Sequence, residues 1–200
     1  MRHRRHGRVL GRSPSHRRAL LRNLASALFL TEREESEFDP NQPKVKGRII
    51  TTLAKAKEIR PMVEKCVTIA KHAIAADRAS KEFGTEAQRN SADWKTWRES
   101  ETYRKWVEAR APVVTARRKL FSMLRHKQAV EILVDRIAER FADRAGGYTR
   151  ILKLATPRLG DAGPRAILEF TGKNDRVNRR SEKPDFGSDA DTAPSTDAAE

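Results

Sequence analysis

The first 31 residues contain no acidic side chain, and this feature constrains the chain more than any other. They carry eight arginines and three histidines, and the first carboxylate is Glu32. Mutual repulsion among so many cations opposes their burial in a globular core. Gly7, Gly11 and the lack of a hydrophobic period predict a flexible extended arm over residues 1–12. Such an arm indicates a polyanion, an anionic membrane surface or an organelle import receptor as its partner.

A helix is predicted directly after the arm. Ser13 followed by Pro14 is a helix-start signal, with serine as N-cap and proline at the first helical position. Apolar side chains then recur at helical spacing: Leu20, Leu21, Leu24, Ala27 and Leu28. Arg17, Arg18 and Arg22 lie mostly off this stripe, so the helix is expected to have one apolar side and one cationic side.

The rest of the chain predicts a mixed fold with a small sheet. In chain order, we expect a polar loop at 31–47, a strand at 48–52, helices at 53–76, 114–126 and 128–143, and strands at 148–154 and 164–170. Alternation places Ala166, Leu168 and Phe170 on one face of the last strand, whereas the strand before it alternates too poorly for its faces to be assigned. The predicted fold class is therefore α/β (α+β), a two-layer sandwich with helices over one side of the sheet.

Prolines, glycines and one threonine predict where the helices begin and break. Thr52 is expected to cap the helix that follows it. Pro61 is expected to kink or restart that helix, because proline has no N–H to donate and its ring crowds the preceding turn. The pair Gly146-Gly147 is expected to end the helix at 128–143 through a left-handed cap.

Residues 77–112 differ in character from the rest and are interpreted as a helical insertion ended by Pro112. They hold eight basic and seven acidic residues, all three tryptophans and Tyr103. One interpretation is that these aromatic side chains pack against the body of the protein. The other is that they form a surface for base stacking or for a protein partner.

The charge balance restricts the possible partners. The formal net charge is +15, although residues 184–200 contain five acids and no lysine or arginine. This excess favours nucleic acid or an anionic membrane surface. No apolar run approaches 18 residues, so we expect no membrane span. The single cysteine, Cys66, lies in a helical pattern and is interpreted as a small buried side chain in a protein of a reducing compartment.

No catalytic constellation is found in the sequence. Metalloprotease, nucleophile-elbow and P-loop motifs are absent, and no cysteine or histidine spacing suggests a metal site. Ser13 and Ser15 near His16 are better explained by capping than by nucleophilic chemistry. We therefore expect no enzyme, no cofactor, no metal and no small-molecule substrate.

The arginines of the arm and first helix suit RNA phosphates. Guanidinium groups bind phosphate bidentately and stack on bases, and a thin arm can enter RNA junctions that a globular face cannot. Lys55 and Lys57 place further cations near a predicted helix N-terminus, where the helix dipole attracts anions. An ordinary exposed helix explains these two lysines equally well.

Three stretches in order resemble the L17 family of bacterial large-subunit ribosomal proteins, also found in mitochondria. They are MRHRRHGRVLGRSPSHRRALLRNLASAL, IITTLAKAKEIRPMVEK and FADRAGGYTRILKL, and PRAILEF resembles the last strand of the family. The resemblance covers roughly residues 1–33, 48–76 and 114–170. It implies an α-β-α(3)-β(2) fold and a structural, non-catalytic role in the cytoplasmic ribosome. It also implies a place near the outer end of the peptide exit tunnel, beside neighbouring large-subunit proteins and away from membranes.

The resemblance also implies which residues meet ribosomal RNA. Besides Gly7 and Gly11, they are Arg2, His3, Arg4, Arg5, His6, Arg8, Arg12, His16, Arg17, Arg18, Arg22, Lys55, Lys57, Tyr148 and Arg150. Tyr148 and Arg150 follow the Gly-Gly turn, which could instead be purely structural.

The chain departs from the short family members at three places, and the expected organisation follows from these. It is an arm at 1–12, one domain at 13–170 and a disordered acidic tail at 171–200, with a long loop at 34–47 and the insertion at 77–112 inside the domain. We expect the insertion to be a peripheral hairpin that touches RNA or a neighbouring protein.

Two other functions and one other interpretation of the N-terminus are open from the sequence. A free DNA-binding regulator could use the helices at 114–126 and 128–143 as a helix-turn-helix, although Glu131, Asp135 and Glu139 would face phosphates badly. An RNA-processing factor would need a catalytic site that the sequence lacks. The basic N-terminus also has the composition of a mitochondrial transit peptide.

Overall fold

A computed structural model describes residues 7–34 and 42–172 of the chain. Helix α1 (Pro14–Leu30) is followed by strand β1 (Arg48–Thr52) and the long helix α2 (Leu53–Lys81). Helix α3 (Ala92–Glu99) and helix α4 (Glu101–Leu124) come next. They are followed by α5 (Lys127–Ile132), a π-helical stretch (Leu133–Ile137), α6 (Ala138–Arg140), β2 (Thr149–Lys153) and β3 (Arg165–Phe170). The predicted mixture of helices with a small sheet is confirmed.

The three strands form one antiparallel sheet in the order β1-β3-β2. The last strand is therefore central, and it pairs Thr52 with Arg165 on one side and Thr149 with Phe170 on the other. Ala166, Leu168 and Phe170 are buried, which confirms the predicted inner face of β3. On the opposite face Ile50 and Leu152 are exposed.

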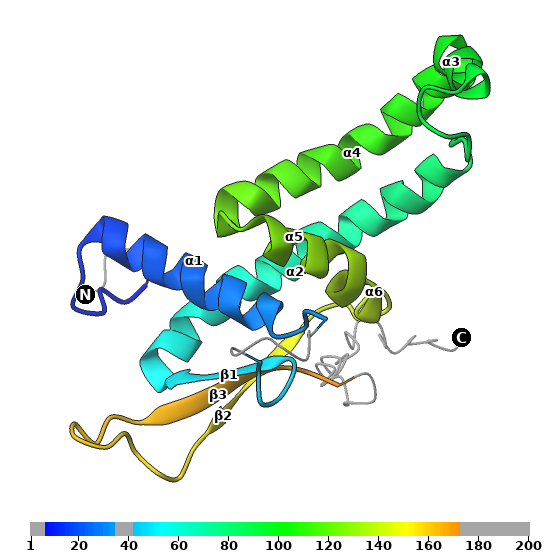
Figure 1. Cartoon of the computed structure of the whole chain (residues 1–200). Helices are drawn as coiled ribbons and strands as arrows, with labels where there is room; N and C mark the ends of the chain where they lie inside the picture. Colours follow the sequence, from blue (N-terminus) through cyan, green and yellow to red (C-terminus); the bar gives the residue numbers. More distant parts are fainter. Residues whose placement is uncertain (1–6, 35–41, 173–200) are drawn as a thin grey trace, which may run out of the picture.

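Helices α1 and α2 lie over one face of the sheet, and the core fills the space between them (Figure 1). The stripe predicted in α2 faces this core, with Ile59, Val63 and Val67 fully buried. The largest other buried side chains come from four further elements and the turn after α6: Leu28, Phe29, Leu120, Leu133, Ile137, Phe141 and Leu168. The apolar sides of these amphipathic helices thus pack into one common core.

Helices α2 and α4 run side by side beyond the core as a long hairpin with α3 at its far end (Figure 1). Trp97, Tyr103 and Trp106 pack on one another there, with ring centroids 5.0–5.9 Å apart. Trp97 Nε1 donates a hydrogen bond to the Phe83 carbonyl at 3.2 Å. The aromatic side chains therefore close the tip of the hairpin and do not pack against the body.

The predicted restart of a helix at Pro61 and the predicted end of a helix at Pro112 are both wrong, for the same physical reason. Helix α2 does not restart at Pro61, and α4 runs through Pro112 although a new helix was expected after it. Each proline leaves the carbonyl four residues earlier, at Lys57 and Glu108, without its helical N–H partner. Both prolines and both of these residues are exposed, so water can satisfy the carbonyls and the helices continue.

The predicted glycine cap is also wrong. The helix ends at Arg140, and short-range backbone bonds such as that from the Phe141 N–H to the Ala138 carbonyl turn the chain out of it. Gly147, with φ of 66°, forms the later turn that leads into β2. Thr52 does occupy the N-cap position of α2, but its side chain makes no capping bond; the Leu53 N–H donates instead to the Pro164 carbonyl at 2.9 Å.

Candidate nucleic-acid interface

The described part of the N-terminal arm passes close to the first turns of α2. Gly7 has a φ of 92°, and a Cβ placed on it would lie 2.7 Å from the Glu58 Oε1 atom. A residue without a side chain is therefore favoured at this approach, both by backbone conformation and by space. The contact joins the arm to the part of α2 that carries Lys55 and Lys57, so two segments predicted separately share one surface. The predicted residues Arg2, His3, Arg4, Arg5 and His6 lie outside the described residues.

The arm folds back on itself before α1 begins. The Arg12 Nη1 atom donates to the Leu10 carbonyl at 2.7 Å, and Arg17 Nη1 donates to the Arg8 carbonyl at 3.4 Å. Ser13 is the N-cap of α1, and its hydroxyl accepts from the His16 N–H at 3.5 Å, as the sequence predicted. These bonds use backbone oxygens, so the positive charges of the arginines are not neutralised.

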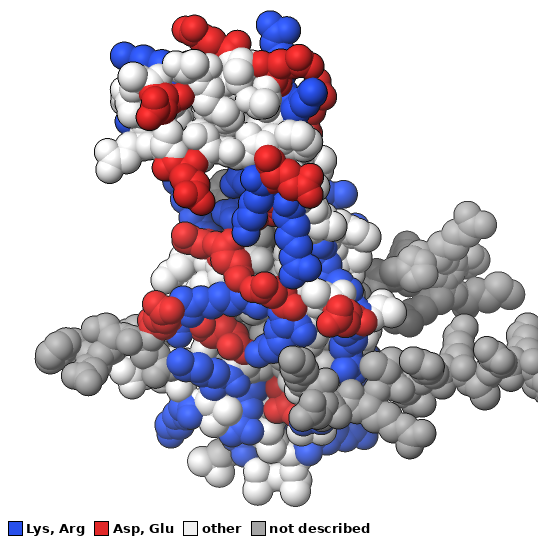
Figure 2. Space-filling model, turned by 90° about the vertical axis from the view of Figure 1, so that its right-hand side faces the viewer, with Lys and Arg blue, Asp and Glu red and all other residues white. Residues whose placement is uncertain are grey.

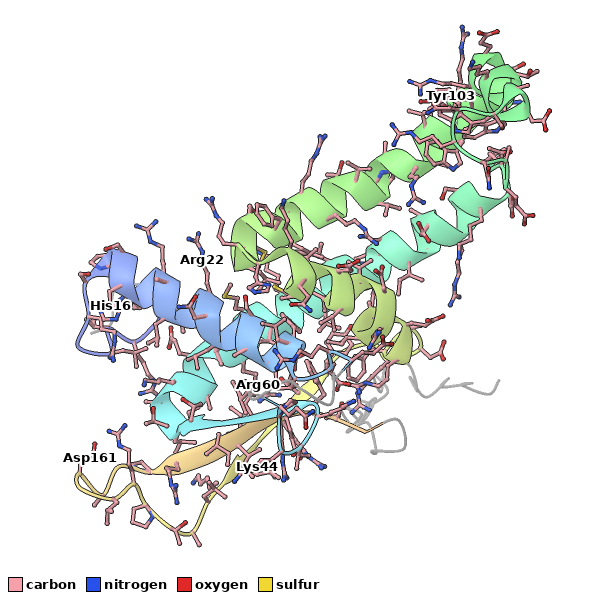
Figure 3. All side chains as sticks on the ribbon, viewed as in Figure 1. His16, Arg22, Lys44, Arg60, Tyr103 and Asp161 are labelled. Carbon is pink, nitrogen blue, oxygen red and sulfur yellow. The ribbon has the colours of Figure 1, made fainter. Side chains whose placement is uncertain are left out.

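The cations around this junction are unpaired within the described chain. Arg8, Arg22, Lys55 and Lys57 have no ion pair or hydrogen bond from their charged groups to any described residue. His16 lies at the start of α1 beside the arm, and Arg22 lies further along the same helix (Figure 3). A set of cations without acidic partners leaves a positive potential that an external anion can neutralise.

Several cations elsewhere in the described structure are paired with acids. Arg117 contacts Asp135 at 2.7 Å, Arg140 contacts Glu32 at 3.0 Å, and Arg136 pairs with Glu34. Arg110 reaches Asp77 at 2.7 Å and ties α4 to α2. These pairs hold elements of the fold together, so the number of arginines alone does not locate the interface.

Two residues predicted to meet RNA have structural environments. Tyr148 is only 3% exposed, and its ring packs against Phe141 with centroids 5.2 Å apart. Arg150 pairs with Glu169 across the sheet at 2.5 Å. The ring of Tyr148 is thus unavailable for base stacking, and the structure favours the alternative that the Gly-Gly turn is structural.

Glu64 holds that turn, and the sequence analysis missed it. Its carboxylate accepts hydrogen bonds from the N–H groups of Tyr148 and Thr149 at 3.0 and 2.9 Å, and from the Thr149 hydroxyl at 2.6 Å. A carboxylate with three donors anchors the start of β2 on α2. No local signal identifies Glu64, because its partners lie more than 80 residues further along the chain.

The net charge differs between the hairpin segment and the rest of the described structure. Within the described residues, the hairpin segment 77–112 has eight basic and seven acidic residues, whereas everything else has 26 basic and ten acidic residues. On the face shown in Figure 2, both signs are mixed over the hairpin, while lysine and arginine predominate on the lower part around the sheet. A polyanion is therefore expected to contact the base of the molecule.

Other kinds of site are not supported over the described ranges. No group of three or more histidine, cysteine or carboxylate residues is placed to hold a metal ion in residues 7–34 and 42–172. None of the helices that the structure describes is long and apolar enough to cross a bilayer. Cys66 is buried, and loss of solvation raises the pKa of its thiol to about 12, so it behaves as the predicted small apolar side chain.

The pair formed by α4 and the helical run from α5 to α6 is unsuited to enter a DNA groove. Asp135 is engaged by Arg117, Glu139 lies 3.7 Å from Arg78, and Glu131 is exposed. Carboxylates along the second helix would repel a phosphate backbone. The fold thus gives no support to the helix-turn-helix alternative.

Comparison with known proteins identifies the family. The family described as "Ribosomal protein L17" matches residues 20–171. The chain is 59% identical to the "Large ribosomal subunit protein bL17" of Rhodopirellula baltica, over 99% of this chain and 95% of that protein. Proteins of the same name from Nitratidesulfovibrio vulgaris and Allorhizobium ampelinum are 36% and 33% identical, covering 86% and 96% of this chain and 88% and 98% of theirs. The cationic arm, the fold and these matches together show that the chain belongs to the ribosomal protein L17 family.

Proposed function

We propose that the protein is a structural constituent of the large ribosomal subunit in the cytoplasm and binds ribosomal RNA through its N-terminal base. The base is defined as the arm, the cationic side of α1 and the first turns of α2. The observation that carries the proposal is the contact of Gly7 with Glu58, which brings the arm beside Lys55 and Lys57. The names of the relatives, all large-subunit proteins, support the same assembly.

The mechanism of binding follows from unpaired charge. Guanidinium and ammonium groups without acidic partners can replace the counterions around phosphates, and release of those counterions drives association. The residues with this role would be Arg8, Arg12, Arg17, Arg18, Arg22, Lys55 and Lys57, while His16 would hydrogen-bond or stack. The predicted contacts of Arg2, His3, Arg4, Arg5 and His6 extend the same surface toward the terminus. The contacts predicted for Tyr148 and Arg150 stay predictions, and Arg150 is half-exposed beside Glu169.

A position near the outer end of the peptide exit tunnel, beside neighbouring large-subunit proteins, is the finer part of the proposal. It is supported by the resemblance of the arm and of the RAGGYTRI turn to the family pattern. A cryo-EM map of the ribosome from the source organism tests this position directly.

The RNA-binding role is tested with two matched charge variants of the full chain. Replacing Arg8, Arg17 and Arg22 with glutamine removes three charges from the base, and replacing Arg89, Lys95 and Arg104 removes three from the hairpin. Filter binding to large-subunit rRNA at several salt concentrations is measured for both. Log K falls as log salt rises, and the steepness of this fall is what the variants change. The base variant is expected to reduce the magnitude of the slope by about two to three, and the hairpin variant by less than about one. Equal slopes for the two variants would contradict the proposed interface.

A deletion tests whether the arm is needed for assembly. Removal of residues 1–12 is expected to abolish co-sedimentation with the large subunit and to leave the circular dichroism spectrum of the body unchanged. Assembly of the trimmed chain as efficient as that of the full chain would overturn the role of the arm. The mass of the intact protein from purified particles separates a mature arm, which retains Arg2, from a removed transit peptide.

A further inference from the structure

The outer side of α4 carries a regular apolar stripe that the core does not use. Val107, Val114 and Phe121 follow one another at seven-residue intervals and are 42%, 40% and 39% exposed. Seven residues are close to two helical turns, so the three side chains align along one side of the helix. The core-facing side of the same helix is occupied by Val113, Leu120 and Leu124, which are buried. Core packing therefore does not explain the stripe.

The stripe runs into an open groove between α4 and α5. Val114, Phe121 and Val130 form its apolar part, and the groove has a volume of about 480 Å³. A contiguous exposed apolar surface on a water-soluble helix is typical of an interaction site. The distance along the axis from Val107 to Phe121 is about 21 Å, the length of about four helical turns.

Charged residues border this groove, and their pairing is uneven. Arg117 is already neutralised by Asp135 at 2.7 Å. Arg118 and Lys127 have no ion pair or hydrogen bond from their charged groups within the described chain. Glu131 is the one carboxylate among the residues that line the groove. The border is thus predominantly cationic around an apolar floor.

We infer that this groove and stripe bind an acidic amphipathic α-helix of a neighbouring protein in the large subunit. Apolar side chains at seven-residue spacing suit the seam between two helices that pack at a shallow angle, and they would bury the stripe along its length. Carboxylates on the flank of that helix would pair with Arg118 and Lys127. RNA fits the surface less well, because a phosphate backbone offers no apolar group to cover Val114 and Phe121 and is repelled by Glu131.

The inference rests on the proposed function, because the partner is sought within assembled large subunits. A benzophenone photo-crosslinking amino acid is placed at position 114 of the full chain, and a control probe is placed at Thr115, the next residue around α4, which is also exposed. Sedimentation first shows whether the labelled chain enters the large subunit; failure at this stage counts against the proposed function. Particles that contain the chain are then irradiated and the crosslinked peptides and nucleotides are identified.

The expected result is a protein crosslink from position 114, to a segment that is helical and carries carboxylates on one side, with little from position 115. A charge reversal, Arg118→Glu, is expected to lower this crosslink about fivefold, whereas Lys119→Glu on the same helix should leave it nearly unchanged. Crosslinks from position 114 to rRNA, to a second copy of this chain or to a segment without carboxylates, or no crosslink in particles that contain the chain, would overturn the inference and leave the proposed function intact.

Discussion

The helical hairpin and the rest of the described structure use their charges in different ways. Outside residues 77–112, basic residues outnumber acidic ones by more than two to one, and those around the arm have no acidic partner within the described chain. In the hairpin the two signs nearly balance, and arginines are used internally: Arg98 lies over the rings of Trp94 and Tyr103, and Arg110 lies over Trp106 while pairing with Asp77. Charge that is satisfied internally builds structure, and charge left unsatisfied is available to a partner.

The comparison also bears on the interpretation of the aromatic segment as a surface for base stacking. Arg98 and Arg110 occupy ring faces at 4.9–5.7 Å from the centroids, and the rings themselves contact one another. Base stacking needs a free ring face. The tip cluster is therefore better explained as the closure of the hairpin, and the outer side of α4 is the better candidate for a partner.

The largest expected effect comes from a matched pair of truncations on α4. Leu120→Ala removes a fully buried side chain and is expected to cost about 3 kcal/mol of unfolding free energy, because it leaves a cavity where α4 meets the hydrophobic core. Val114→Ala removes an exposed side chain and is expected to cost less than about 0.5 kcal/mol. Urea denaturation measures both. A large loss for Val114→Ala would mean that the stripe belongs to the core.

A substitution at the tip tests whether the tip of the hairpin unfolds independently of the core and sheet. Trp97→Ala removes two ring contacts and the bond to the Phe83 carbonyl, and is expected to destabilise the tip locally by about 1–3 kcal/mol. Hydrogen exchange should accelerate across residues 83–106 and stay unchanged in β1 and β3. Acceleration in the strands would show that the two halves unfold as one unit.

Cys66 reports on the hydrophobic core and not on the tip of the hairpin. It is fully buried, and loss of solvation raises the pKa of its thiol from its ordinary value near 9.0 to about 12. The folded state therefore favours the neutral thiol, and this contribution to stability is complete below pH 9 and is lost as pH rises toward 12. Native protein at pH 8 is expected to react with a thiol reagent only when the hydrophobic core opens and exposes Cys66 to solvent. Leu120→Ala should speed this labelling and Trp97→Ala should not; the opposite order would break the comparison.

The smallest expected effect separates two glycines of the arm. Gly7 and Gly11 both have positive φ, but only Gly7 has a close neighbour for an added Cβ. Each change to alanine is expected to cost about 1 kcal/mol of backbone strain, and Gly7→Ala should also push the arm from α2. Binding to rRNA should weaken more for Gly7→Ala than for Gly11→Ala. Glu58→Ala should restore part of the loss if the contact with Glu58 is its cause.

Local signals in the sequence were sufficient for several elements. Ser13-Pro14 gave the start of α1, the β-branched run at 48–52 gave β1, and alternation gave the inner face of β3, because each depends on neighbouring residues alone. The breaks predicted at Pro61 and Pro112 were wrong because the effect of a proline depends on whether the carbonyl four residues earlier is exposed to water. That exposure is a property of the folded surface. The faces of β2 could not be assigned because β2 is an edge strand with one buried end and one exposed end.

The candidate site shows the same division. Its composition was evident from the sequence, since eight arginines without an acid need no fold to be recognised. Its geometry was not, because Gly7 and Glu58 meet across 51 positions and Tyr148 is drawn into the core by Phe141 and by the Glu64 bonds to its turn. Contacts between distant segments depend on packing that no single motif encodes.

The central place of β3 has a consequence for synthesis of the chain. Strand β1 finds its hydrogen-bonding partner only when residues 165–170 have been made, 113 positions after Thr52. At elongation rates of about 5–20 residues per second, β1 stays unpaired for about 6–23 s after it is translated. If the proposed function holds, the arm and α1 are available to ribosomal RNA before the sheet closes, and the order of binding and sheet closure is then set by translation.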